Sequence, residues 1–200
     1  LNLYLEKHRF SNTSTTDLWD ALEVASGEPV RTTMGTWVNQ AGHPLVTAER
    51  AGASRLRLSQ RRFLLGAGSA RDDAERVGAV SPEAGSAPGT QLWVVPVTLR
   101  YATADGNIEH HQLLLRDAST TVELKGEPLW ALVNEGAWGV YRSHYGQDLR
   151  QSLFGALEHL DGRERLSLAA DTWAATVAGL VPLESSLALW TRLRHDRDPD

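Results

Sequence analysis

The spacing of hydrophobic positions changes twice along this chain. Apolar residues recur every three to four positions in residues 1–43 and again in 146–200, as they do in amphipathic helices. Between them, residues 44–145 alternate apolar and polar positions, the period of a half-buried strand. The pattern therefore predicts an α+β chain with helices at both ends of a central β region.

The first zone predicts three helices. An amphipathic pattern begins at Leu1 without a capping residue, and the chain opens without an initiator methionine, so we expect it to be part of a longer polypeptide. Ser14-Thr15-Thr16-Asp17 is typical of a capping box, and Gly27 suits the end of that second helix. Pro29 suits the first turn of the third, which we expect to end at Gly42.

The second zone predicts short antiparallel strands, which together favour a β-sandwich. The clearest strand is Leu92–Tyr101, and Pro96 within it predicts an edge position or a bulge. Ala104–Asn107 predicts a hairpin turn. The Gly-, Ala- and Ser-rich stretch 66–90 is expected to be a mobile surface loop. The other expected strands begin at Pro44 and Arg55 or span Ile108–Leu115, Thr120–Leu124, Leu129–Asn134 and Val140–His144.

The third zone predicts consecutive helices. A first apolar face runs from Leu149 to Leu160 and is interrupted by Asp161-Gly162. A third helix starts after Pro182. The second and third helices are expected to use the apolar faces Leu166, Ala170, Trp173 and Val177, and Leu183, Leu187 and Trp190.

Charge and composition exclude several classes of partner. A net charge of −5 disfavours nucleic acid and anionic membranes, both of which call for clustered Lys and Arg. No apolar run approaches the roughly 20 residues of a membrane-spanning helix. The sequence has no cysteine, which fits a reducing compartment, and we expect a cytoplasmic location.

Pairs of reactive residues occur, but none has the spacing of a catalytic or metal site. His110 and His111 are adjacent on a strand, so their side chains point to opposite faces and cannot share an ion. Ser143-His144 diverge for the same reason, and Glu158-His159 is expected at a helix end. Gly66–Ser69 lacks the lysine of a phosphate-binding loop. Arg142 is expected to form a buried or interface ion pair.

Four stretches follow one another in a distinctive order: Tyr4–His8 with Asn12 and Asp17-Leu18-Trp19, Trp37–Val46, Gln60–Leu64 with Leu92–Val97, and Asn134–Tyr145, which carries the pattern N…GxYR. In this order they resemble the zinc aminopeptidases of the aminopeptidase N (gluzincin) family, and each has the expected element type. The resemblance covers nearly the whole chain outside 66–90. A further segment, Arg165–Trp173, is similar to the opening of that family's C-terminal helical domain.

The resemblance implies a three-part assignment. Residues 1–43 would close a thermolysin-like catalytic domain, 44–145 would form a fibronectin-like β-sandwich, and 146–200 would begin the helical domain over the active site. The family binds zinc through HExxH and a downstream glutamate, and binds the substrate amine through GxMEN. Neither motif occurs here, and Met34 lies in Thr-Met-Gly. We therefore expect no catalytic, cofactor-binding or metal-binding residue in this chain.

The resemblance thus predicts a non-catalytic part of a peptidase that removes N-terminal amino acids from peptides. Zinc and peptide substrates would belong to the parent enzyme, and this part would pack on domains outside it. The alternative is a free-standing β-sandwich module that binds proteins. If domain partners are missing, we expect exposed apolar surface around Leu1–Leu5 and Leu183–Trp190, where copies of the chain would pair in a crystal.

Overall fold

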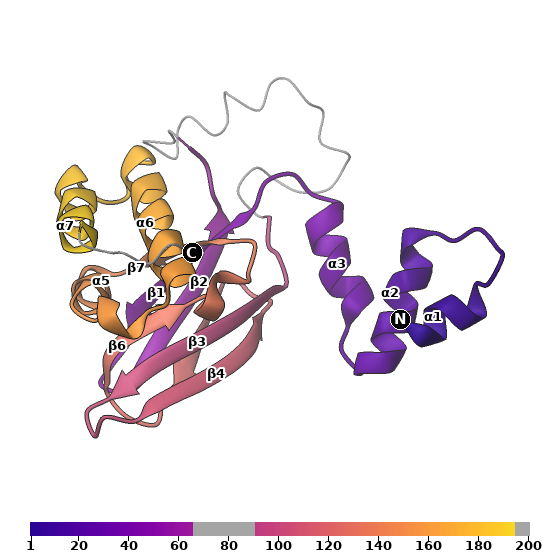
Figure 1. Cartoon of the computed structure of the whole chain (residues 1–200), viewed down its shortest axis with the longest axis horizontal. Helices are drawn as coiled ribbons and strands as arrows, with labels where there is room; N and C mark the ends of the chain where they lie inside the picture. Colours follow the sequence, from indigo (N-terminus) through magenta and orange to yellow (C-terminus); the bar gives the residue numbers. More distant parts are fainter. Residues whose placement is uncertain (66–90, 195–200) are drawn as a thin grey trace. The chain divides into compact units, whose positions relative to one another are not determined.

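The computed structural model describes residues 1–65 and 91–194 and divides into two compact units, Leu1–Ala41 and Gly42–Asp200. Each unit is described by itself. The predicted loop 66–90, with Gly66–Ser69, lies outside the described residues. The helices and two sheets confirm the α+β class and the sandwich-like arrangement with flanking helices (Figure 1).

The first unit holds three helices, as predicted: α1 (Asn2–Lys7), α2 (Thr15–Ser26) and α3 (Val30–Val38). Ser14 and Asp17 form the capping box of α2, and Gly27 ends it with a left-handed φ of 73°. A bidentate contact from Arg31 to Asp20 ties α3 to α2. α3 ends at Val38 and is capped by Asn39, so it is shorter than predicted from Gly42.

The second unit contains two sheets with strand orders β5-β2-β1-β7 and β4-β3-β6. In the described part of the chain, the strand pairs are antiparallel except β1 with β7, which is parallel. The sequence predicted a wholly antiparallel sandwich, and the structure differs from that prediction at this one pair. The strands are β1 (Pro44–Arg50), β2 (Arg55–Arg62), β3 (Val95–Thr103), β4 (Ile108–Leu115), β5 (Ser119–Glu123), β6 (Pro128–Val133) and β7 (Arg142–Tyr145).

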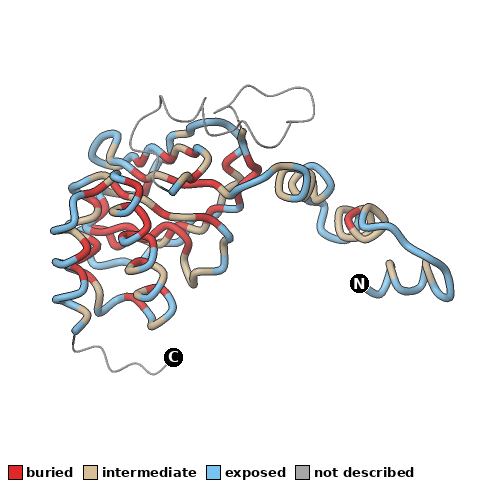
Figure 2. Tube along the Cα trace, turned by 90° about the horizontal axis from the view of Figure 1, so that it is seen from above, coloured by how far each residue is buried: buried red, intermediate tan, exposed pale blue. Residues whose placement is uncertain are grey.

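Alternation along these strands builds the core. Leu56 and Leu58 of β2 and Val97 and Leu99 of β3 are almost fully buried. Figure 2 shows buried segments gathered in this unit. Trp93 is also fully buried, although the strand predicted from Leu92 begins only at Val95.

Pro96 does not lie on an edge strand, because β3 is the central strand of its sheet. It pairs with Leu114 of β4, whereas the pairing of β3 with β6 begins only at Leu99. Pro96, which has no backbone N–H, therefore lies in the part of β3 that pairs with β4 alone. This part of the strand resembles an edge strand, where a proline is tolerated. The register does shift further along, between Ala102 and Thr103.

The predicted hairpin turn between β3 and β4 is confirmed. The Thr103 N–H donates to the Asn107 carbonyl at 3.0 Å, and the Gly106 N–H donates to the Thr103 carbonyl at 2.9 Å. Gly106 has a φ of 83°, which requires its lack of a Cβ.

The C-terminal helices differ from the prediction in two ways. The helix expected to reach Leu160 ends at Phe154, and a 3₁₀ turn, η2 (Leu157–His159), follows it. The next helix turns its expected apolar face outward, with Leu166 68% exposed and Trp173 44% exposed. A second 3₁₀ turn, η1 (Glu135–Ala137), precedes β7, and the helices are α5 (Gln147–Phe154), α6 (Gly162–Val177) and α7 (Leu183–Leu193).

The reason for the reversal of α6 is that its buried face carries charge. Glu164 and Asp171 are buried together with Leu168, Ala174 and Ala175. Predicting the buried side of a helix from its apolar residues assumes that carboxylates face water. The assumption fails here because arginines on the neighbouring strands pair with the buried carboxylates. Among the described helices, none is long and apolar enough to cross a membrane.

Candidate functional site

The most distinctive polar cluster of the second unit lies where α6 meets the sheets. We call it the α6 junction and define it as Arg100, Asn134, Glu135, Arg142, Ser143, Glu164 and Asp171. Burying charged groups costs free energy unless each is paired. The charged groups of the α6 junction must therefore be paired for the fold to be stable.

Glu164 makes three contacts from a side chain that is 1% exposed. Its Oε2 accepts a hydrogen bond from Arg100 Nη2 at 2.7 Å and from the Asp161 N–H at 3.0 Å. Its Oε1 accepts from the Gly136 N–H at 2.8 Å. One carboxylate thus joins β3, η1 and the capping box of α6.

Arg100 extends this contact to further groups. Its Nη2 also donates to the His159 carbonyl at 2.9 Å, and its Nη1 lies 3.5 Å from Glu135 Oε1. The guanidinium carbon lies 5.9 Å from the centre of the Trp130 ring. A planar guanidinium suits this site because it can contact several acceptors at once.

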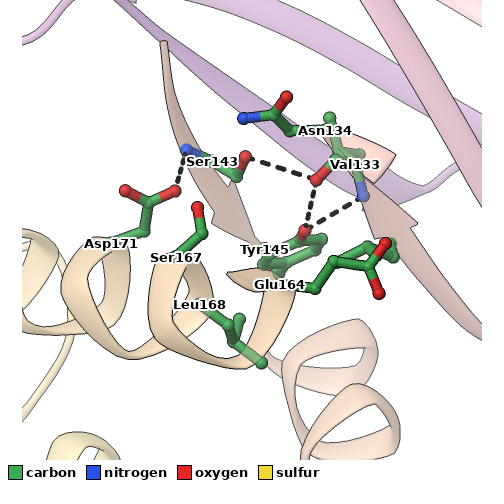
Figure 3. A pocket seen from close by; sticks show the side chains of 9 residues that line it. Val133, Asn134, Ser143, Tyr145, Glu164, Ser167, Leu168 and Asp171 are labelled. Carbon is green, nitrogen blue, oxygen red and sulfur yellow. Dashed lines mark hydrogen bonds between the residues drawn. The ribbon is translucent and has the colours of Figure 1, made fainter. Parts of the chain in front are cut away.

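Asp171 anchors α6 to β7, as Figure 3 shows. Its Oδ2 accepts from the Ser143 N–H at 2.8 Å, and its Oδ1 accepts from Arg142 Nη1 at 3.0 Å. Burial raises the pKa of Asp171, against the opposing effect of Ser143 and Arg142. This pair confirms the ion pair expected for Arg142.

Tyr145 joins β7 to β6 beneath the same contact (Figure 3). Its hydroxyl accepts from the Val133 N–H at 3.0 Å and donates to the Val133 carbonyl at 3.2 Å. Burial raises the pKa of this phenol, so it remains protonated and can donate.

The loop before β7 is shaped by the amide of Asn134. Its Oδ1 accepts from the Gly139 N–H at 2.6 Å and its Nδ2 donates to the Gly139 carbonyl at 3.1 Å. Asn134 and Ala137 both have positive φ values, 69° and 55°. The N…GxYR pattern seen in the sequence thus has a physical role, since Asn134 and Gly139 close the turn that delivers Arg142.

A second amide, outside the α6 junction, links the two sheets. Gln60 of β2 accepts from the Trp93 N–H at 3.0 Å and donates to the Trp93 carbonyl at 2.8 Å. It also donates to the carbonyls of Leu115 and Asp117. We call this contact the Gln60 clamp. It joins the two segments, Gln60–Leu64 and Leu92–Val97, that the sequence analysis grouped as one resembling stretch.

A cavity of about 10 Å³ lies inside the α6 junction. It is lined by residues of β6, β7 and α6, including Ser143, Glu164, Ser167 and Asp171. This volume is about that of one water molecule and far below the several hundred Å³ of a substrate pocket. The α6 junction is therefore built for holding elements together.

Of the candidate pairs from the sequence, Ser143 belongs to the α6 junction, whereas the histidines are not among its residues. His110 Nδ1 lies 3.0 Å from the Glu135 carboxylate, and His111 is exposed on β4. Burial lowers the pKa of His144 to about 4, with Arg150 and Arg61 adding to the effect. The ring of His159 stacks on Trp130 at 5.5 Å between ring centres.

Sequence reasoning missed Glu164, and Asp171 entered only as part of a resembling segment. A signal was present for Glu164, because Asp161-x-x-Glu164 has the spacing of a capping box. Nothing in a single sequence indicated that this glutamate would also meet Arg100, 64 residues away along the chain.

The donor set does not fit a zinc site within the part of the chain that is described. Across residues 1–65 and 91–194, no group of three or more His, Asp or Glu side chains could hold a metal ion. The carboxylates of Glu164 and Asp171 already accept hydrogen bonds from arginine and backbone N–H groups.

A scan of protein-family models finds no match for this chain. Comparison with known proteins identifies similar proteins that are several times longer than this chain. The chain is 30% identical over 209 residues to aminopeptidase M1-C of Oryza sativa subsp. japonica, covering 99% of this chain and 21% of the relative. It is 30% identical to aminopeptidase M1 of Arabidopsis thaliana, covering 99% and 22%, and 29% identical to aminopeptidase 2 of Candida albicans, covering 93% and 18%. These matches confirm the resemblance: the chain is similar to aminopeptidases along nearly its whole length and spans about a fifth of theirs.

Proposed function

We propose that this chain is a non-catalytic segment of a zinc-dependent aminopeptidase that removes N-terminal amino acids from peptides. Residues 1–43 would close the catalytic domain, 44–145 would be the sandwich spacer, and 146–200 would begin the helical lid. The observation that carries the proposal is the similarity to aminopeptidases along nearly the whole chain. The α6 junction supports the role of spacer, because it joins the sandwich firmly to the helix that follows.

Zinc, its ligands and the peptide-binding groups would lie in polypeptide outside this chain. Support comes from the sequence, which contains neither an HExxH motif nor a GxMEN loop. The absence of cysteine supports a cytoplasmic parent enzyme, although one relative, from Saccharomyces cerevisiae, carries the word mitochondrial in its name.

The experiment compares two proteins with an aminoacyl chromogenic amide in the presence of zinc. One is this 200-residue chain, and the other is the polypeptide encoded by the complete reading frame. We expect turnover by the complete protein only, with loss of that turnover on chelation. Turnover by the isolated chain would contradict its non-catalytic role, and an inactive complete protein at all amides tested would contradict the parent activity.

A second candidate is a free-standing β-sandwich module that binds proteins, and the surface that missing domains would leave uncovered would then be its binding face. Leu183, Leu187 and Trp190 share one side of α7 and are each between 41% and 50% exposed, so together they form an apolar patch of the kind that a partner protein covers. A complete reading frame without HExxH would favour this candidate over the peptidase.

A further inference from the structure

We propose that two buried carboxylates, Glu164 and Asp171, fix α6 on the sheets in a single register, so that α6 and the sandwich form one mechanical body. The domain boundary expected near residue 146 would then not be a hinge, because α6 would move together with the sandwich. This inference does not depend on the aminopeptidase proposal.

The spacing of the two anchors is the first argument. Glu164 and Asp171 lie two helical turns apart and therefore share one face of α6. Their partners belong to different elements, because Glu164 contacts β3 and η1 whereas Asp171 contacts β7. Two separated contacts fix both the position of the helix along its axis and its rotation.

The second argument is that the other buried side chains of α6 are mostly small and would not by themselves fix the position of the helix. Besides the anchors, α6 buries Leu168 and Thr172 together with the small residues Ala174 and Ala175. Alanine surfaces interlock weakly with a neighbour, so they specify register poorly. A shift by one turn would instead leave both carboxylates buried without their arginines, an arrangement that is strongly unfavourable.

The consequence concerns the outer face of α6. Fixing the register determines that Leu166, Trp173 and Val177 point outward, where Trp173 meets Trp190 of α7 with ring centres 5.2 Å apart. The buried ion pairs therefore decide which apolar surface the helices present to whatever packs on them.

Hydrogen exchange of the unmodified 200-residue chain tests the inference without any variant. If α6 and the sandwich open together, backbone amides in the middle of α6 should exchange at rates within about tenfold of the slow amides of β6 and β7. Exchange in α6 that is about a hundredfold faster or more would show that the helix opens alone, and would overturn the proposal.

Variants then assign the coupling to the two carboxylates. Glu164→Gln and Asp171→Asn keep the shape of each side chain and remove its charge. Each should speed exchange in α6 by about tenfold or more while the amides of β1 and β2 change less. If a variant fails to fold, the exchange rates of the unmodified chain still decide the proposal.

Glu123→Gln is the matched control. It breaks an exposed pair with Arg55 of 2.7 Å, in which both side chains are more than half exposed. Exposed pairs contribute little, so α6 exchange should be unchanged. Equal effects of the control and the anchor variants would contradict the proposed role of the buried carboxylates.

Discussion

At the scale of single residues, the most informative positions are polar side chains that are buried in the fold. Gln60, Asn134, Glu164 and Asp171 are each no more than 6% exposed, and each uses its side chain to hold backbone groups of other segments. Removing one partner of such a contact costs more than forming it contributes, because the group left behind stays buried. Substitutions at these sites should therefore be more damaging than surface changes.

His144 should make stability depend on pH. Burial lowers its pKa to about 4 in the folded state, whereas the unfolded side chain has the ordinary value of 6.5. The folded state thus prefers the neutral ring, so this contribution is complete above about pH 6.5 and is lost as the pH falls toward about 4. Relative to His144→Gln, the unmodified chain should lose on the order of 1–2 kcal/mol of unfolding free energy across this window, since the ring is partly exposed.

Urea denaturation at several pH values measures this difference. His111→Gln is the control, because His111 lies on the same kind of element but is exposed. A pH profile that is the same for His144→Gln and the unmodified chain would contradict the predicted effect.

Gly139→Ala should destabilise the second unit by about 2 kcal/mol or more. A Cβ at this position would overlap the Tyr141 ring and would lie 2.8 Å from Asn134 Oδ1, so the turn before β7 must shift. Gly126→Ala is the control, because its Cβ would meet only Thr103 at an ordinary 3.6 Å. Equal midpoints of urea denaturation for the two variants would show that the turn adapts freely.

At the scale of elements, the two sheets are joined by directed contacts as well as by apolar packing. The Gln60 clamp connects β2 with the segment before β3, and Tyr145 connects β7 with β6. These links set the relative register of strands that do not pair directly. A packed apolar core alone would fix that register less strictly.

Replacing Gln60 with methionine tests the Gln60 clamp. The side chain keeps its size but loses its hydrogen bonds to the Trp93 N–H and carbonyl, so we expect a loss of about 2–4 kcal/mol in unfolding free energy. Arg57→Met, on the exposed side of β2, should change it by less than about 0.5 kcal/mol. A loss for Gln60→Met as small as the control's would mean that packing replaces the clamp.

At the scale of the whole molecule, the notable feature of the second unit is apolar surface on its C-terminal helices. Leu166, Trp173 and Val177 of α6 and Leu183, Leu187 and Trp190 of α7 are each at least 41% exposed. In the first unit, Leu1, Leu3 and Leu5 are exposed as well. The exposure of Leu1–Leu5 and of the α7 residues matches the sequence prediction of uncovered apolar surface, whereas the exposure of the α6 residues was not predicted.

A double variant, Trp173→Ser with Trp190→Ser, should reduce the fluorescence of a bound hydrophobic dye by about half or more, because the two rings contribute most of the aromatic surface there. Trp138→Ser is the control, as Trp138 is 75% exposed on a separate loop. Circular dichroism checks that the variants stay folded. Unchanged dye binding in the double variant would contradict a continuous apolar surface on α6 and α7.

The sequence predicted those features that depend on neighbours in the chain. The capping box at Ser14, the turn at Gly106 and strand β4 need only local geometry, and each lies where the pattern indicated. The resemblance to aminopeptidases was also readable, because four spaced stretches occur in order along one sequence.

Only the tertiary structure decided the features that depend on partners distant in the chain. It placed β3 at the centre of its sheet, and it turned the charged face of α6 inward toward Arg100 and Arg142. The free energy of burying a carboxylate depends on whether a cationic side chain lies next to it in the folded protein. A single sequence does not reveal which distant residue supplies that cation. Periodicity determined which segments are helices and strands, whereas long-range electrostatics determined which way they face.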